Sequence, residues 1–425
     1  MKATLALLLI FISKLHGFLH LTRIRSSTIV GRGFCGNKKT CILLNMSHQN
    51  SDCSNLKIVI AGAGVIGTST AYYLAKNHQA SISSITLVDP TGSIAPAASG
   101  KAGGFLALDW NDYSPVGPLA RRSFELHQTL ADTLGSDKIM YRRLTCASIS
   151  VDESNGRRKP TGKKLEGIEW VDDVATRVRS LGDESTIAQV HPKLLCEAMW
   201  EAVQKQDNLE SELKIGKVVS ANYEGDNEDK KLIGAKLEDG SIIDADIVLY
   251  SCGPWTEYGK CMLGVKYHSA IIPTKPRILS QSVFFDGFGD PEVYPRPDGT
   301  AYCTGFPDAA IRVTEIPGQE EVRNETIQKI LNAVREASGG TDGALGQNPE
   351  ISQSCYLPTT LDNLPMIGEI PEQKGCYLAA GHGCWGILMG PATGEAMASL
   401  IITGKSTKIN LNPFRPDRFR GMEMW

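Results

Sequence analysis

Acidic side chains are absent from the first 51 residues of this 425-residue chain. The same stretch contains seven basic residues: Lys2, Lys14, Arg23, Arg25, Arg32, Lys38 and Lys39. An acid-free segment with scattered basic and hydroxyl residues is typical of an organelle transit peptide. We therefore expect residues 1–54 to be a targeting leader for a plastid or a mitochondrion. A secretory signal, an unprocessed tail, a product that starts at Met46 and a cytoplasmic location remain alternatives.

The leader also lacks an apolar run long enough to cross a membrane. Its apolar segment, Leu5–Ile12, has eight residues, whereas a membrane-spanning helix needs about 20. We expect no transmembrane anchor.

Paired metal-binding cysteines are missing as well. The chain has 11 cysteines, but none forms a C-x-x-C pair and no histidine cluster lies near one at zinc spacing. We expect no metal site, and reduced, buried thiols that argue against secretion.

An excess of positive charge is absent from the remainder of the chain. The 374 residues after Ser51 carry 37 basic and 47 acidic side chains, a net charge of −10, within a whole-chain charge of −3. This balance argues against a nucleic-acid partner. The content of 42% hydrophobic and 21% charged residues excludes a wholly disordered chain.

A glycine-rich turn follows the first predicted strand, Leu56–Ala61. Its residues are Gly62, Ala63, Gly64, Val65, Ile66 and Gly67. A helix is expected over Thr68–Asn77, and a second strand, Ser84–Asp89, ends in an acid. Strand, glycines, helix, strand and terminal acid in this order predict a dinucleotide site.

Each part of this motif has a physical role. Gly62 permits the tight turn, Gly64 lets the pyrophosphate approach the backbone, and Gly67 lets the helix lie close to the strand. The helix N-terminus offers free N–H groups and partial positive charge to the pyrophosphate. Asp89 would accept hydrogen bonds from a ribose without a phosphate, which favours FAD or NAD over NADP.

Six further segments follow in a characteristic order. They are Ala97–Phe105, Val190–Pro192, Ile215–Val219, Asp244–Trp255, Asp362–Gly368 and Gly381–Gly386, with Pro391–Glu395 opening the last helix. This order resembles the FAD-dependent D-amino-acid oxidase superfamily, which includes sarcosine and glycine oxidases. The resemblance extends from about Leu56 to about Gly404.

The resemblance implies FAD as the cofactor and gives further residues a role in binding it. Ser99, Gly100, Ala102 and Gly103 match the loop beside the flavin ring. Val218 matches the strand residue whose backbone meets the adenine, and Gly253 matches a glycine near the pyrophosphate. Gly381, His382, Gly383 and Gly386 match the loop at the pyrimidine end of the flavin. Cys355 has the spacing of the cysteine that carries the flavin covalently in sarcosine oxidases, although a buried strand cysteine is the plainer interpretation.

Two residues are candidates for catalysis. His382 could relay a proton or contact the flavin, and Trp385 could cap the substrate pocket. Structural roles remain the alternative for both residues.

The expected fold is α/β, with a discontinuous Rossmann-like FAD-binding domain and an α+β substrate domain on a largely antiparallel sheet. The FAD-binding segments are 55–105, 186–256 and 350–410, the substrate segments are 106–185 and 257–349, and a tail covers 411–425. Asp298-Gly299 predicts a hairpin turn. Gln319–Ala337 predicts an amphipathic helix with Val322, Ile327, Ile330, Leu331 and Val334 as its apolar stripe.

One position departs from the family pattern. Amino-acid oxidases of this family commonly have an arginine five residues before the Asp362 position, where it binds the substrate carboxylate, and this chain has Leu357. Leucine cannot form a bidentate clamp. Arg277 or Arg296 could replace it, and Tyr294 and Tyr302 would face a substrate site if the strand register is right.

These observations predict an FAD-dependent oxidase or dehydrogenase that takes hydride from a C–N bond of a small amine or amino-acid-like substrate. Oxygen or another electron acceptor would reoxidise the flavin. Alternatives are a flavin-bound protein with low turnover in trafficking or scaffolding, and oxidation of a C–O bond in a hydroxy acid.

Overall fold

A computed structural model describes residues 55–151, 168, 170–171, 175–225, 230–274 and 280–420. The predicted leader and Arg277 lie outside the described residues. The predicted dinucleotide motif is present: β1 (Leu56–Ala61) leads through the glycine turn into α2 (Val65–His78), and β2 (Ile82–Asp89) ends at the predicted acid.

The first sheet has six strands in the order β19-β20-β12-β1-β2-β8. The remaining members are β8 (Glu210–Ile215), β12 (Ile247–Tyr250), β19 (Met366–Glu369) and β20 (Cys376–Ala380). All neighbours are parallel except β19, which is antiparallel to β20. Strand β1 is apolar because both of its faces are covered: Ile58 and Ile60 join one hydrophobic cluster and Val59 another.

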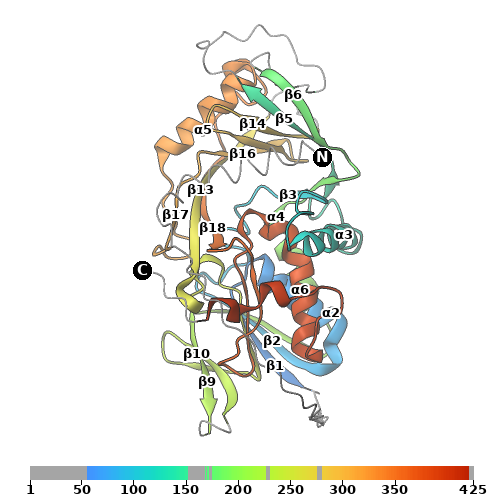
Figure 1. Ribbon diagram of the computed structural model, residues 1–425, viewed down its shortest axis with the longest axis vertical. Coiled ribbons are helices and arrows are strands. Elements are labelled where there is room, and N and C mark those ends of the chain that lie inside the picture. Colours follow the sequence, from blue (N-terminus) through green and yellow to red (C-terminus); the bar gives the residue numbers. More distant parts are fainter. Residues whose placement is uncertain are drawn as a thin grey trace, which may run out of the picture. The chain divides into compact units, whose positions relative to one another are not determined.

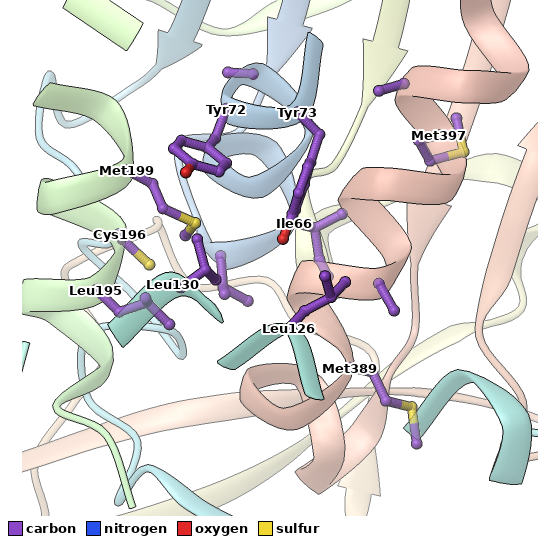
Figure 2. Close-up of a cluster of buried hydrophobic side chains, with 14 of the residues drawn as sticks. Ile66, Tyr72, Tyr73, Leu126, Leu130, Leu195, Cys196, Met199, Met389 and Met397 are labelled. Carbon is purple, nitrogen blue, oxygen red and sulfur yellow. The ribbon is translucent and has the colours of Figure 1, made fainter. Parts of the chain in front are cut away.

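Helices cover one face of this sheet (Figure 1). Helix α2 contacts α4 (Pro192–Gln204) and α6 (Gly386–Thr403), and α6 also contacts α3 (Gly117–Leu134). Figure 2 shows side chains from all four helices meeting in one apolar cluster, among them Tyr72, Tyr73, Leu126, Leu130, Leu195 and Met397. Among the described residues, the span Gly383–Thr403 alone is long and apolar enough to cross a membrane, and 67% of its most apolar window is buried inside the protein.

The second sheet has eight strands and is largely antiparallel, as predicted. Its order is β17-β13-β16-β15-β14-β5-β6, and β18 pairs with β13. The strands are β5 (Thr145–Val151), β6 (Ala175–Gly182), β13 (Met262–Pro273), β14 (Gln281–Asp286), β15 (Glu292–Pro295), β16 (Thr300–Gly305), β17 (Ala310–Ile311) and β18 (Ile351–Thr360). Only β14 and β5 are parallel neighbours. The α/β fold class with an antiparallel second sheet is confirmed.

Two three-stranded sheets complete the fold. One contains β9 (Val218–Glu224), β10 (Lys231–Leu237) and β11 (Ile242–Asp244). The other contains β3 (Phe105–Ala107), β4 (Arg142–Arg143) and β7 (Ile187–Gln189).

Helix α5 (Asn324–Ala337) covers one face of the second sheet (Figure 1). Four members of its predicted stripe are buried, namely Ile327, Ile330, Leu331 and Val334. The predicted start at Gln319 and the placement of Val322 in the stripe were wrong, because the helix begins five residues later and Val322 is exposed. Arg323 has an extended backbone, and its N–H donates to Nε2 of His268 at 3.0 Å, so the approach to the helix is held by β13.

The predicted domain division remains a prediction, because Cys53–Trp425 forms one unit by its contacts. The six strands of the first sheet do come from the three segments assigned to FAD binding. Strand β18 also lies in the third of those segments, yet it pairs along its length with β13 of the second sheet. The first part of the predicted tail is anchored: Phe414 and Phe419 are buried, and Arg418 forms an ion pair with Asp362 at 2.7 Å.

Candidate cofactor and substrate site

At two positions of the turn after β1, no residue other than glycine fits. Gly62 has a φ of +100°, and a Cβ there would lie 2.4 Å from the carbonyl oxygen of Ser251. A Cβ on Gly67 would lie 2.1 Å from the carbonyl oxygen of Gly62. The loop, the helix and the end of β12 are therefore in backbone contact, which is the cradle that a dinucleotide pyrophosphate requires.

The N-terminus of α2 is held by a second loop. Gly64, the N-cap, is extended and forms no side-chain cap, while Val65 N–H donates to Oγ of Ser99 at 2.9 Å. Ala63 and Ile66 are buried, so this turn presents its backbone rather than its side chains. Ser99 thus lies against the N-terminus of α2, and its predicted place in the loop beside the flavin stays a prediction.

Asp89 lies at the end of β2 with 5% of its surface exposed. Its carboxylate accepts hydrogen bonds from Ala63 N–H at 3.2 Å and from the N–H and hydroxyl of Thr91 at 3.0 and 2.7 Å. A carboxylate can accept about four hydrogen bonds. Asp89 therefore holds the turn in place and can still accept a hydrogen bond from a ribose hydroxyl. Its binding of the ribose remains a prediction.

The loop containing Gly100 and Gly103 is tightly enclosed. A Cβ on Gly100 would lie 2.0 Å from the carbonyl oxygen of Ala95. A Cβ on Gly103 would lie 2.3 Å from the ring of Tyr294 and 2.8 Å from that of Tyr302. The loop predicted to pass beside the flavin is therefore in direct contact with the second sheet.

Val218 and Gly253 lie near the same end of the first sheet. Val218 opens β9, and Gly216 N–H just before it donates to the carbonyl oxygen of Asp89 at 3.2 Å. Gly253 follows β12 with a φ of +55°, and no atom lies within 4 Å of its virtual Cβ. Ser251, which sequence reasoning missed, donates its hydroxyl to the carbonyl oxygen of Ala61 at 2.9 Å. This serine lies in the predicted segment Asp244–Trp255, where the pattern gave it no role of its own.

The loop Gly381–Gly386 connects β20 to α6. Gly381 and Gly383 have φ values of +88° and +59°, whereas Gly386 has room for a Cβ, whose nearest neighbour would be 3.7 Å away. His382 is 5% exposed, and its Nε2 lies 3.1 Å from Oγ1 of Thr393. Burial lowers the pKa of His382 to about 3, so its imidazole is neutral. Its catalytic role stays a prediction, and burial disfavours the cationic form of its ring.

Cys355 lies on β18 opposite Tyr267 of β13. Its side chain is buried, and burial raises the pKa of its thiol to about 12. Nearby, Nε2 of Gln353 donates to the carbonyl oxygen of Lys101 at 3.1 Å, which holds β18 against the predicted flavin loop. Cys355 is therefore near that loop, and a covalent bond to the flavin remains a prediction.

Trp385 belongs to an aromatic cluster at the junction of the two sheets. Its ring lies 6.0 Å from that of Trp110, which in turn lies 5.1 Å from Phe105 and 5.4 Å from Phe284. The ring of Tyr294 stacks on Phe105 at 5.4 Å.

Tyr302 extends this cluster across the sheet. The rings of Tyr294 and Tyr302 are 5.7 Å apart with an interplanar angle of 6°, and the two residues are directly paired across β15 and β16. Sequence reasoning identified these tyrosines but missed Phe105, Trp110 and Phe284. Phe105 stands in the predicted flavin loop and could have been found there. The other two are placed only by the tertiary fold.

The described residues fit FAD. Gly62 and Gly67 bring the backbone of the turn close to β12 and to the start of α2, where a pyrophosphate could bind. The loop with Gly100 and Gly103 contacts the aromatic cluster. No group of three or more metal-binding side chains occurs in the described part of the chain.

Comparison with protein families agrees with this geometry. Residues 57–400 match the DAO family, described as FAD dependent oxidoreductase. An oxidoreductase of Schizosaccharomyces pombe is 32% identical over 388 residues, covering 85% of this chain and 97% of that protein. Glycine oxidase of Geobacillus kaustophilus is 25% identical over 400 residues, covering 86% and 97%.

Solved structures show the same fold. The crystal structure of that glycine oxidase covers 87% of this chain and 100% of its own, with a TM-score of 0.68 and 20% identity. L-Proline dehydrogenase from P. horikoshii covers 88% and 100%, with a TM-score of 0.68 and 20% identity. The chain is an FAD-dependent oxidoreductase and belongs to the DAO family.

Proposed function

We propose that the protein oxidises a C–N bond of a small amine or amino-acid-like compound. The observation that carries this proposal is the contact between the predicted flavin loop and the aromatic cluster. Gly103 lies directly against Tyr294 and Tyr302, and Phe105 continues from the loop into the cluster. A substrate in this place would lie between the flavin loop and an aromatic wall, in which the hydroxyl of Tyr294 donates to the carboxylate of Glu292.

A buried aromatic wall suits amine oxidation. Burial disfavours the charged form of an amine and lowers its pKa, and a neutral amine has the lone pair that supports loss of hydride from the adjacent carbon. Burial also raises the pKa of Tyr294 and Tyr302 far above neutrality, so these phenols stay protonated. The amine would lose its proton to solvent as it enters the site, because the protonated phenols cannot accept one. Bound FAD supplies the hydride acceptor.

Named relatives support the same chemistry. Besides glycine oxidases, a 4-methylaminobutanoate oxidase of Paenarthrobacter nicotinovorans is 23% identical over 382 residues, covering 83% of this chain and 44% of that protein. These names describe oxidation next to a nitrogen atom. Oxygen or another acceptor would then reoxidise the flavin.

Anaerobic reduction of the yellow holoenzyme tests the proposal. Glycine, sarcosine and proline are compared with hydroxy acids such as glycolate and lactate, and dithionite gives the absorbance of the fully reduced flavin. We expect at least one amine to bleach the flavin and its hydroxy analogue to leave it oxidised. Bleaching by hydroxy acids alone, or by dithionite alone across a broad panel, would refute C–N oxidation.

We also propose that residues 1–54 direct the protein to a plastid or a mitochondrion, supported by the acid-free composition of residues 1–51. Fusion of residues 1–54 to a fluorescent protein tests this location. Diffuse cytoplasmic fluorescence would contradict it.

A further inference from the structure

Glu292 places a carboxylate on the aromatic face of the second sheet. It opens β15, and alternate residues of a strand share a face, so Glu292 and Tyr294 lie on the same side. The hydroxyl of Tyr294 donates to the carboxylate of Glu292. Phe284 is the direct partner of Glu292 on β14. The wall beside the predicted flavin loop is therefore not purely aromatic, because it also carries a carboxylate.

The opposite face of the same strands is apolar. The residues next to Phe284, Glu292 and Tyr302 along their strands, Val283, Val293 and Cys303, belong to the hydrophobic cluster that α5 joins. Strand alternation thus separates an apolar face covered by a helix from a face with aromatic rings and a carboxylate. Glu292 is only half-buried, so a ligand against the aromatic face can contact it.

The surroundings of Glu292 connect it to the candidate site. A Cβ on Gly103 would lie 2.3 Å from the ring of Tyr294, so the flavin loop lies against the ring whose hydroxyl contacts Glu292. Burial, followed by the charge of Glu292, raises the pKa of Tyr267 on β13 and of Cys146 on β5. Desolvation and the same charge raise the pKa of Cys384 in the loop that leads into α6. The carboxylate is thus close to groups from two further strands and from the second loop assigned to the flavin.

The cation that follows β15 lies at the other end of the aromatic stack. Arg296 comes two residues after Tyr294, and its Cζ lies 5.7 Å from the ring centroid of Tyr302. Four residues of extended chain place the backbones of Glu292 and Arg296 about 13 Å apart. A small ligand against Phe284 and Tyr294 therefore lies beside the negative charge of Glu292.

A carboxylate beside aromatic rings suits a positively charged ligand. The faces of aromatic rings attract an ammonium group, and the carboxylate adds direct charge attraction. The same charge repels a carboxylate of a ligand. Leu357, which the register of β18 and β13 places on this face two residues beyond Cys355, offers a carboxylate no donor. This part of the face favours positive over negative groups.

We propose that Glu292 and the rings of Phe284 and Tyr294 bind a cationic group of the substrate other than the nitrogen that is oxidised. Because the reacting amine has to be neutral when hydride leaves the adjacent carbon, the cation beside Glu292 is a second group, a protonated or quaternary amine. This inference rests on the proposed function and narrows it: the substrate is a small amine with an additional positive charge.

Binding of choline and of neohexanol to the yellow holoenzyme tests the proposal without oxidation of an amine. Neohexanol is the uncharged carbon analogue of choline, so the two probes share their shape and their hydroxyl group and differ in the charge. Binding is measured by perturbation of the flavin spectrum and by calorimetry. We expect the unmodified protein to bind choline about ten- to hundredfold more tightly than neohexanol, the usual range for a contact with a charged group.

Variants then assign that preference to one side chain. Glu292→Gln removes the charge but keeps an oxygen that can accept from Tyr294, so it should lower the preference about tenfold and leave neohexanol affinity unchanged. Glu336→Gln makes the same change on α5, on the other face of the sheet, and is the matched control, which should bind both probes as the unmodified protein does. If Glu292→Gln fails to fold, Glu292→Asp, which shortens the side chain by a methylene, gives the result through a reduced preference.

Two outcomes would overturn the assignment: no preference for choline in the unmodified protein, or an undiminished preference in the Glu292 variants. Failure of every amine to bleach the flavin would refute C–N oxidation instead. The choline preference would still report on Glu292, so the two failures are distinguishable.

Discussion

Two of the buried histidines, His127 and His382, should make the protein sensitive to mild acid. His127 is completely buried, with Nε2 at 2.9 Å from the carbonyl oxygen of Ile387, and His382 is 5% exposed. Burial lowers the pKa of His127 to about 4, partly offset by backbone carbonyls, and that of His382 to about 3. Both are neutral in the folded protein at pH 5, whereas unfolded histidine titrates near 6.5.

The direction of this pH dependence follows from proton binding. Below about pH 6.5 the unfolded chain binds a proton at each histidine that the folded protein does not bind, so acid favours unfolding. This stability is fully present above pH 6.5 and is lost as the pH falls toward the folded values. At pH 5 each histidine lowers the free energy of unfolding by about 2 kcal/mol, about 4 kcal/mol for the two. A typical protein has about 5–15 kcal/mol in total.

Proton uptake on unfolding measures this effect directly. Guanidinium unfolding in a pH-stat at pH 5.5 should take up close to two protons from His127 and His382, since free histidine is about 90% protonated there. His191, whose pKa burial also lowers to about 4, should add close to one further proton, and His268, whose pKa burial lowers as well, should add to the uptake. Uptake from these histidines should be near zero at pH 8.

His127→Gln provides the test variant, because its amide can replace the hydrogen bond to Ile387. It should lower the uptake at pH 5.5 by about one proton. His78→Gln is the control: the pKa of His78 is also lowered by burial, but this side chain lies only partly in the protein, and its replacement should change the uptake less. Equal uptake in the unmodified protein and His127→Gln would refute the reasoning.

Three further predictions concern the cofactor site and the chain end. Gly67→Ala places a Cβ 2.1 Å from a backbone oxygen and should yield protein without bound flavin after gel filtration. The control is Gly240→Ala in the turn between β10 and β11, which meets no atom within 4 Å but keeps a φ of +88°; it should cost only about 1–2 kcal/mol and retain FAD. Equal flavin loss in both would contradict the steric argument. Acid precipitation of the holoenzyme should give a yellow pellet if Cys355 carries the flavin, and Cys355→Ser should then give a colourless one; a colourless pellet from the unmodified protein would exclude the bond. Phe419→Ala should lower the free energy of unfolding by about 3–5 kcal/mol, measured by urea titration, because the ring is 3% exposed; an unchanged midpoint would show that the chain end is not anchored.

The dinucleotide motif could be predicted from the sequence because its signals are local. The motif occupies only 34 residues, from the start of β1 to Asp89 at the end of β2. Steric limits dictate its glycines, and the exposed N–H groups of the helix N-terminus dictate where the pyrophosphate can bind. The hairpin at Asp298-Gly299 was found for the same reason, since Gly299 has a φ of +87°. Order and spacing of the later motifs then identified the family.

Long-range contacts explain the errors and omissions. The start of α5 was placed too early because Arg323 is held by His268, 55 residues away. Strand β18 lies in a segment assigned to FAD binding but finds its partner in β13. Trp110 and Phe284 look like ordinary core residues in the sequence, and only packing brings them to Trp385 and Phe105.

The sequence by itself determined the cofactor class, the family and the two kinds of sheet, because short-range geometry and ordered motifs carry that information. The tertiary structure decided which side chains share the face opposite the flavin loop. It brought Phe105, Tyr294 and Tyr302 together and left the Nε of Arg296 without a hydrogen-bond partner. Leu357 pairs with Val265, more than 90 residues away, and Arg296 contacts Ala102, 194 residues away, so no local pattern could have shown these contacts.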